Sequence, residues 1–135
     1  MLALNSHKAV GNSLTLKLAS ENCGELTKIV EESVRLQNET GYPQTIIVSG
    51  SSGSGKTYAT MALLKHLFRI TSGENSDVFK HMSAAFTVLR SLGSAQTATN
   101  KESSRIGHFI EAQVSNGSEL YRTKIHCYFL DQVIF

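Results

Sequence analysis

Cysteine is scarce in this chain of 135 residues, with only Cys23 and Cys127, far apart in the sequence. That number and spacing predict neither a disulfide nor a zinc site, so we expect two free thiols and a reducing compartment. No apolar run approaches the roughly 20 residues that span a bilayer, and residues 1–10 lack the apolar stretch of a secretory signal. A net charge of +2 favours no nucleic-acid partner. These absences predict a cytoplasmic protein without a membrane-spanning segment.

Internal repeats, low-complexity tracts and interdomain linkers are lacking too. A length of 135 residues fits one domain or less, with a core of modest size. We therefore treat 1–135 as one unit.

What the chain does have is a glycine-rich run at residues 50–57, which fits the phosphate-binding pattern G-x-x-x-x-G-K-[ST]. A β-branched run at 45–48 predicts a strand before it, and helical spacing of apolar residues begins after Lys56. Inward-facing backbone N–H groups and the positive end of a helix suit a phosphate. We expect Lys56 to reach the β- and γ-phosphates and Thr57 to bind Mg²⁺. The predicted backbone cradle is Gly50, Ser51, Ser52, Gly53, Ser54 and Gly55.

Other segments predict the remaining architecture. Apolar spacing and end signals indicate one helix from about Asn22 to the Gly41-Tyr42-Pro43 break and another from Ser76 or Asp77 to Gly93. A polar segment at residues 94–104 then leads to β-rich runs at 106–114 and 123–130, joined by a hairpin turn at Asn116-Gly117. Residues 1–4 read as the end of a strand. The order predicts an α/β fold of the P-loop NTPase kind, with a central, mostly parallel sheet, flanking helices and a C-terminal β-hairpin.

Several phrases together resemble the myosin motor domain. Myosins carry G-E-S-G-A-G-K-T and then a switch I loop N-x-N-S-S-R-F-G-K-F-I, and this chain has residues 50–57 followed by Asn-Lys-Glu-Ser-Ser-Arg-Ile-Gly-His-Phe-Ile at 100–110. Residues 92–97 resemble F-G-N-A-x-T, residues 4–8 resemble the purine-site loop N-P-F-K, and residues 125–132 resemble a strand ending in Y-L-L-E-K. Five phrases in the family's order cover the chain from end to end.

The resemblance, with substitutions of the sort found in divergent unconventional myosins, implies part of an actin-based motor that binds ATP and Mg²⁺ and is associated with the cytoskeleton. By matched position, Asn5 lies at the adenine side, Asn100 contacts phosphates, and Ser104 joins Thr57 on Mg²⁺. Ser103 helps to orient the attacking water or relay its proton, and Arg105 pairs with an acid of switch II. Lys56, Ser103 and Arg105 are thus the expected catalytic residues.

Two departures from the family pattern limit these expectations. Glu102 stands where an Asn is usual, and its carboxylate would repel the γ-phosphate unless it points outward or pairs with Lys101. No D-x-x-G-F-E run for switch II and no actin-binding region occur in the 135 residues. Phosphoryl transfer needs groups on all sides of the γ-phosphate. We therefore expect at most weak nucleotide binding from this chain and no movement along actin.

Alternatives remain open at this point. A small GTPase would explain Asp131 after an apolar run, although D-x-x-G and N-K-x-D are missing. A kinesin would also supply an S-S-R switch, but that switch continues S-H, whereas Ile106-Gly107 follows here. A third possibility is a non-catalytic chain that holds nucleotide or serves a structural role. The histidines lack metal-ligand spacing, so we expect them on the surface or hydrogen-bonded.

Overall fold

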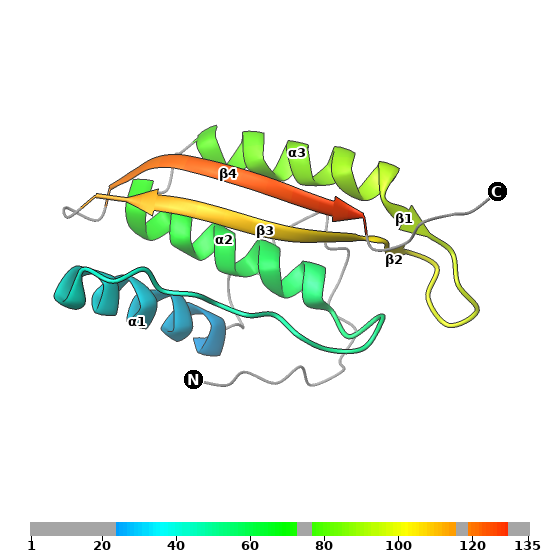
Figure 1. Ribbon diagram of the computed structural model, residues 1–135, viewed down its shortest axis with the longest axis horizontal. Helices are drawn as coiled ribbons and strands as arrows, with labels where there is room; N and C mark the ends of the chain where they lie inside the picture. Colours follow the sequence, from blue (N-terminus) through cyan, green and yellow to red (C-terminus); the bar gives the residue numbers. More distant parts are fainter. Residues whose placement is uncertain (1–23, 73–76, 116–118, 130–135) are drawn as a thin grey trace.

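A computed structural model describes residues 24–72, 77–115 and 119–129 (Figure 1). Three helices form: α1 (Gly24–Thr40), α2 (Lys56–Ser72) and α3 (Asp77–Leu92). The strands are β1 (Ser94–Ala95), β2 (Ser103–Ser104), β3 (Ile106–Val114) and β4 (Leu120–Phe129). The predictions for residues 1–5, for the helix start at Asn22, for the Asn116-Gly117 turn and for Asp131 lie outside the described residues.

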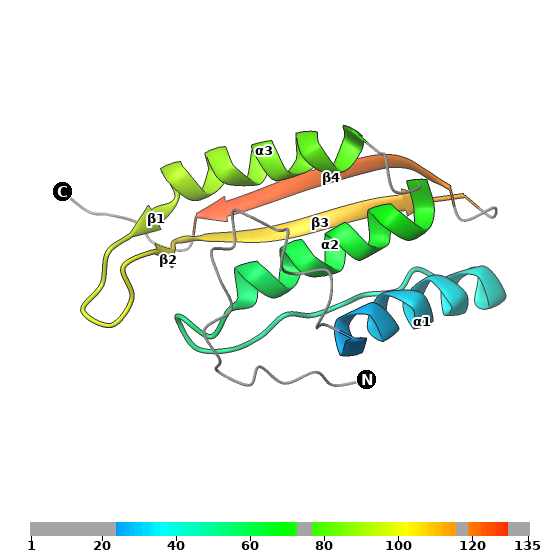
Figure 2. The ribbon, with the colours of Figure 1, turned by 180° about the vertical axis from the view of Figure 1, so that it is seen from behind.

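The helices are layered on a long antiparallel hairpin. Figures 1 and 2 show α2 and α3 side by side on one face of β3–β4, with α1 packed along α2. The middle position of α2 explains why it buries residues on more than one side. The main core cluster joins α2 to α3, and partly buried side chains of β3 and β4 pack against it. Its buried members are Met61, Leu64, Phe68, Met82 and Phe86.

The predicted hairpin forms, with bounds close to those expected. β3 pairs with β4 from Ile106 opposite Phe129 to Val114 opposite Leu120, with an irregularity between Gln113 and Val114. β4 begins three residues before the predicted start at Thr123. Alternation places Ile110 and Ile125 against the helices.

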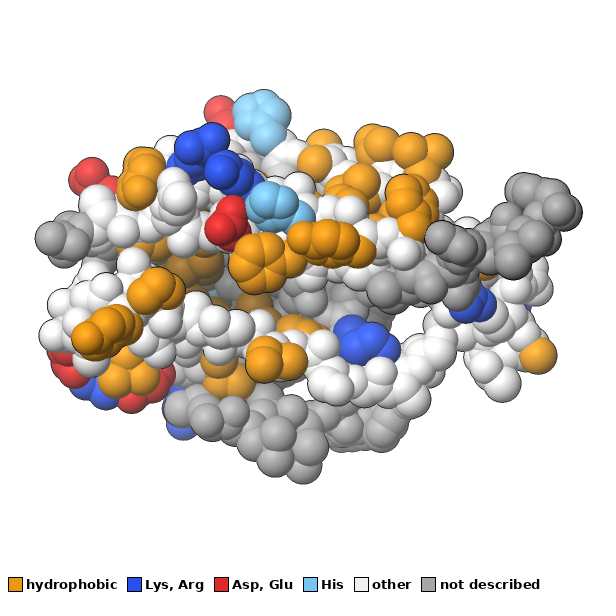
Figure 3. Space-filling view, viewed as in Figure 1, with side chains coloured by type: hydrophobic (Ala, Val, Ile, Leu, Met, Phe, Trp, Pro, Cys, Tyr) orange, Lys and Arg blue, Asp and Glu red, His pale blue; other side chains and the backbone are white. Residues whose placement is uncertain are grey.

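The opposite face of this hairpin is left uncovered by the described helices. Figure 3 shows hydrophobic side chains gathered on it. Phe109 and Tyr128, which alternation places on this face opposite His126 and Gly107, are 52% and 57% exposed. These two rings therefore remain open to contact with other apolar surfaces.

The predicted parallel sheet is wrong for the described residues. They contain two two-stranded antiparallel sheets, β1–β2 and β3–β4. The run at 45–48 forms no strand, and Ile47 is 83% exposed. A parallel strand needs hydrogen-bonded neighbours and cover on both faces, and the described residues offer this run neither. Its β-branched composition alone therefore did not produce a strand.

The histidines only partly follow the prediction. His126 pairs with Glu111 at 2.9 Å, His81 is exposed, and His66 is buried but hydrogen-bonded. His108 differs, since its ring stacks on Phe86 and its buried Nε2 has no hydrogen-bond partner among the described residues. Cys127 is a free thiol, as expected, while Cys23 lies outside the described residues. No helix in the described ranges is both long and apolar enough to cross a membrane.

His66 links α2 to α1 and makes the fold sensitive to pH. The residue is 5% exposed, and its Nε2 lies 3.0 Å from the Thr27 hydroxyl on α1. Burial, followed by the charges of Arg69 and Lys65, lowers the pKa of His66 below its ordinary value of 6.5. The folded state therefore resists taking up the proton that the unfolded chain accepts readily.

We expect the contribution of His66 to the free energy of unfolding to be fully present above pH 6.5. The free energy of unfolding should fall as the pH drops below that value. The sign follows because the unfolded state binds more protons in this window. Chemical denaturation at a series of pH values down to about pH 5 measures the slope. A His66→Gln variant should have a shallower slope, with a remainder from His108, whose pKa is also lowered by burial. Equal slopes in variant and wild type would contradict the assignment.

Candidate functional site

The glycine-rich run forms a tightly curled loop at the start of α2. Gly50, Gly53 and Gly55 have φ angles of 153°, 79° and 87°, a region that favours glycine. The amide of Ser54 donates to the carbonyl of Ser51 at 3.2 Å and closes the turn. A Cβ on Gly50 would stand 2.5 Å from the Ser54 hydroxyl oxygen. The curl therefore depends on Gly50 and Gly55, which the sequence pattern specifies, and on Gly53 between them. We call residues 50–57 the phosphate loop.

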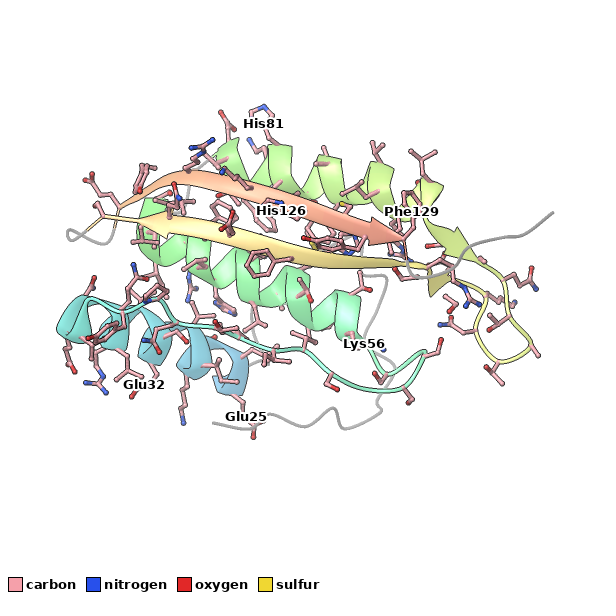
Figure 4. All side chains as sticks on the ribbon, viewed as in Figure 1. Glu25, Glu32, Lys56, His81, His126 and Phe129 are labelled. Atoms are coloured by element: carbon pink, nitrogen blue, oxygen red, sulfur yellow. The ribbon has the colours of Figure 1, made fainter. Side chains whose placement is uncertain are left out.

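Lys56 lies across this loop. It is the first residue of α2, and Figure 4 shows it at the helix end beside the loop. Its ammonium donates to the carbonyls of Gly50 and Ser51, each at 2.7 Å. A positive charge is thus held where the loop meets the positive end of the helix dipole. Such a charge attracts anions, and the two carbonyl contacts are replaceable by phosphate oxygens.

The polar segment, residues 94–104, folds against the phosphate loop. The Ser52 and Ser103 hydroxyl oxygens are 3.2 Å apart, and the Asn100 side-chain amide donates to the Ser52 oxygen at 3.1 Å. Ser103 is buried, with the residue 6% exposed. Three predicted site residues therefore meet at one point, although about 50 positions separate them in sequence. Gly53 lies at the same contact, since a Cβ there would be 3.8 Å from the Asn100 Nδ2.

Local hydrogen bonds fix the shape of the polar segment. β1 and β2 pair as Ser94–Ser104 and Ala95–Ser103, which makes residues 96–102 the tip of a small hairpin. Within the tip, the Thr97 amide and hydroxyl both donate to the Asn100 carbonyl. The Arg105 amide donates to the Gly93 carbonyl at 2.7 Å and ties the base of the segment to the end of α3. The tip that reaches the phosphate loop is therefore supported by α3.

The structure supports the two expected metal ligands, Thr57 and Ser104, less directly than the contacts of Ser52, Asn100 and Ser103. The Ser104 hydroxyl donates to the Ile106 carbonyl at 3.1 Å and also accepts from the Ile106 amide. The Thr57 side chain is exposed, and no hydrogen bond among the described residues joins it to Ser104. Nor do the described ranges hold a cluster of three His, Cys, Asp or Glu residues suited to a metal. The pairing of Thr57 with Ser104 on Mg²⁺ stays a prediction, as does the adenine contact of Asn5, which lies outside the described residues.

One contact was not foreseen from the sequence. Glu102 forms an ion pair with Arg90, in the last turn of α3, rather than with Lys101. The Glu102 side chain is 61% exposed, and its partner is Arg90 instead of the Lys101 considered from the sequence. Recognising that residues 94–95 and 103–104 pair as strands would have indicated the contact, since that pairing returns the chain to the end of α3.

The arrangement suits an anionic ligand. A curled glycine loop at a helix start, a lysine over it and a hydroxyl- and amide-bearing segment against it are the elements of a phosphate-binding site.

Comparison with known proteins places the chain in a family. The family described as myosin head (motor domain) matches residues 16–134. The chain is 39% identical over 92 residues to Myosin-D of Toxoplasma gondii, covering 67% of this chain and 11% of that protein. It is 30% identical over 146 aligned positions to Myosin-1 of Saccharomyces cerevisiae, covering 96% of this chain and 8% of the relative. Against human unconventional myosin-Vc it is 25% identical over 140 positions, covering 98% and 8%.

The chain belongs to the myosin head (motor domain) family. It spans 4% to 11% of the length of these and similar curated relatives. The resemblance noted from the motifs is therefore confirmed at the level of the family.

Proposed function

We propose that this chain binds Mg-ATP as the nucleotide-binding part of an actin-based motor. Residues 1–135 then form part of a motor domain, and in the complete motor the partner is the actin filament and the location the cytoplasmic cytoskeleton. Membership of the myosin family supports this proposal. The observation that carries it is the contact between the polar segment and the phosphate loop through Ser52, Asn100 and Ser103.

The residues present fit the phosphates of ATP. Positive-φ glycines keep side chains away from the loop interior, and Lys56 supplies a cation that donates to two backbone carbonyls among the described residues. Gly50, Ser51, Ser52, Gly53, Ser54 and Gly55 would cradle the phosphates, Lys56 would reach the β- and γ-phosphates, and Asn100 would contact them from the polar segment. Thr57 offers an exposed hydroxyl, and hard Mg²⁺ prefers such oxygens together with phosphate oxygens and water.

The proposed roles of Ser103, Ser104 and Arg105 require contacts beyond those described above. Ser104 would have to release its hydrogen bond to the Ile106 carbonyl to bind Mg²⁺. Ser103 already lies beside Ser52, where it would help to position a water near the γ-phosphate. Arg105 would close the site by pairing with an acid, and no D-x-x-G-F-E run that would supply it occurs in residues 1–135. We therefore limit the proposal for residues 1–135 to the binding of Mg-ATP.

A thermal unfolding titration tests the proposal. A ligand at about 100 times its Kd stabilises the folded state by about 2.7 kcal/mol, so Mg-ATP should raise Tm by several degrees. ATP with EDTA should raise it less, because Thr57 and the phosphates then lack their shared cation. No shift with Mg-ATP would favour a purely structural chain. A shift with Mg-GTP that exceeds the one with Mg-ATP would favour the small-GTPase alternative.

A further inference from the structure

Glu102 places a carboxylate in the segment that touches the phosphate loop. Its backbone amide donates to the Asn100 side-chain oxygen at 3.1 Å, and the Asn100 side-chain amide donates to Ser52. Two hydrogen bonds thus connect Glu102 to the loop proposed to hold a triphosphate. A carboxylate carried by this segment opposes the binding of several negative charges unless it is directed away from them or neutralised.

Arg90 does both. It stands in the last turn of α3, and its guanidinium pairs with the Glu102 carboxylate. The Arg90 side chain is 26% exposed, so it is held against the protein, whereas Glu102 is 61% exposed. The end of α3 is itself fixed to the base of the polar segment, because the Arg105 amide donates to the Gly93 carbonyl. The cation that captures Glu102 is therefore anchored, and the carboxylate is drawn toward α3.

We propose that Arg90 is a positioning residue for nucleotide binding: it holds the Glu102 carboxylate out of the phosphate site and so sets the affinity for Mg-ATP. This inference rests on the proposed function. Without Arg90, the Glu102 side chain samples orientations nearer the loop and its charge is uncompensated. An additional unit charge within about 10 Å of a triphosphate, in a setting between water and protein interior, weakens binding by about three- to tenfold.

The test is a set of variants in the full 135-residue chain, titrated with a fluorescent ATP analogue in the presence of Mg²⁺. Arg90→Ala should weaken affinity about three- to tenfold, and Arg90→Lys should weaken it less because a positive charge remains. Glu102→Asn alone should leave affinity equal or tighter. Glu102→Asn in the Arg90→Ala background should restore it, since the charge that Arg90 restrains is then absent.

Lys80→Ala is the matched control. Lys80 also lies on α3 and also forms an ion pair, with Asp77 at 2.7 Å, but at the opposite end of the helix. The Lys80→Ala substitution removes one positive charge, as Arg90→Ala does, but frees no carboxylate near the loop. The affinity for the nucleotide should therefore change little. Raising the salt concentration should shrink the Arg90→Ala effect, because the repulsion is screened. Melting temperatures should stay close to wild type, since an ion pair whose carboxylate side is 61% exposed adds little stability. If Arg90→Ala fails to fold, Arg90→Gln replaces it with a side chain of more similar length.

The outcomes separate this inference from the function on which it rests. Saturable wild-type binding with unchanged affinity in Arg90→Ala overturns the inference alone. So does a loss that persists in full when Glu102→Asn is added, because Arg90 would then act on something other than Glu102. An equal loss in Lys80→Ala points to net charge and also overturns it. No saturable binding by the wild type overturns the proposed function, and this inference with it.

Discussion

Replacing Lys56 with alanine is expected to abolish measurable nucleotide binding. The Lys56 ammonium lies over the phosphate loop, where its contacts are two backbone carbonyls of the loop itself. Charge-assisted hydrogen bonds contribute about 1.5–3 kcal/mol each, and contacts to two phosphates would therefore account for about a hundredfold or more in affinity. A direct titration of wild type and Lys56→Ala with Mg-ATP measures the effect.

The fold should survive this substitution, because the removed contacts lie at a loop open to solvent. The melting temperature without nucleotide checks this point. Arg69→Ala serves as the control, since Arg69 is an exposed cation in the last turn of the same helix, far from the loop. It removes the same charge and should bind Mg-ATP like the wild type. Unaltered affinity in Lys56→Ala would remove Lys56 from the proposed site.

Replacing Gly93 with alanine is expected to destabilise the fold by about 1–3 kcal/mol, the usual cost of overpacking. A Cβ at this position would overlap the Ile106 side chain and stand 3.0 Å from the Leu89 carbonyl oxygen. Ile106 is buried, with 6% exposed, so its side chain has little room to move. The Gly93 carbonyl also accepts from the Arg105 amide, so a shift here displaces the base of the polar segment. Denaturant unfolding measures the change.

Gly24→Ala is the matched comparison for Gly93→Ala. It adds the same methyl group at the first residue of α1, where no atom of the described residues lies within 4 Å, and should be neutral or slightly stabilising. Ile106→Val removes the terminal methyl that meets the new group. In the Gly93→Ala background it should cost less than the about 0.5–1.5 kcal/mol expected for this change alone. Equal stability of Gly93→Ala and Gly24→Ala would contradict the close approach seen here.

Local patterns in the sequence predicted the helices and the hairpin well, because each depends on periodicity and end signals within a short stretch. Apolar spacing after Lys56 and before Gly93 corresponds to α2 and α3, and alternation corresponds to β3. The family was also predictable, since it rests on several phrases in order. The site residues Ser52, Asn100 and Ser103 were predicted together only through that resemblance.

What could not be predicted depends on contacts between distant segments. Whether residues 45–48 form a parallel strand depends on a neighbour that their own composition does not specify, and the described residues provide none. The pairing of Glu102 with Arg90 rather than with adjacent Lys101 follows from the short β1–β2 ladder, whose two-residue strands have no clear sequence signature. The burial of His66 against Thr27 similarly depends on how α1 packs on α2.

The uncovered aromatic face of β3–β4 favours self-association of the isolated chain in solution. Rings left in water on a two-stranded hairpin, whose outer edges are unpaired among the described residues, favour contact with other apolar surfaces. Self-association of the chain should therefore increase with protein concentration, even where the core is intact. Binding measurements on the purified chain belong at low micromolar concentration, so that ligand uptake is not confused with self-association.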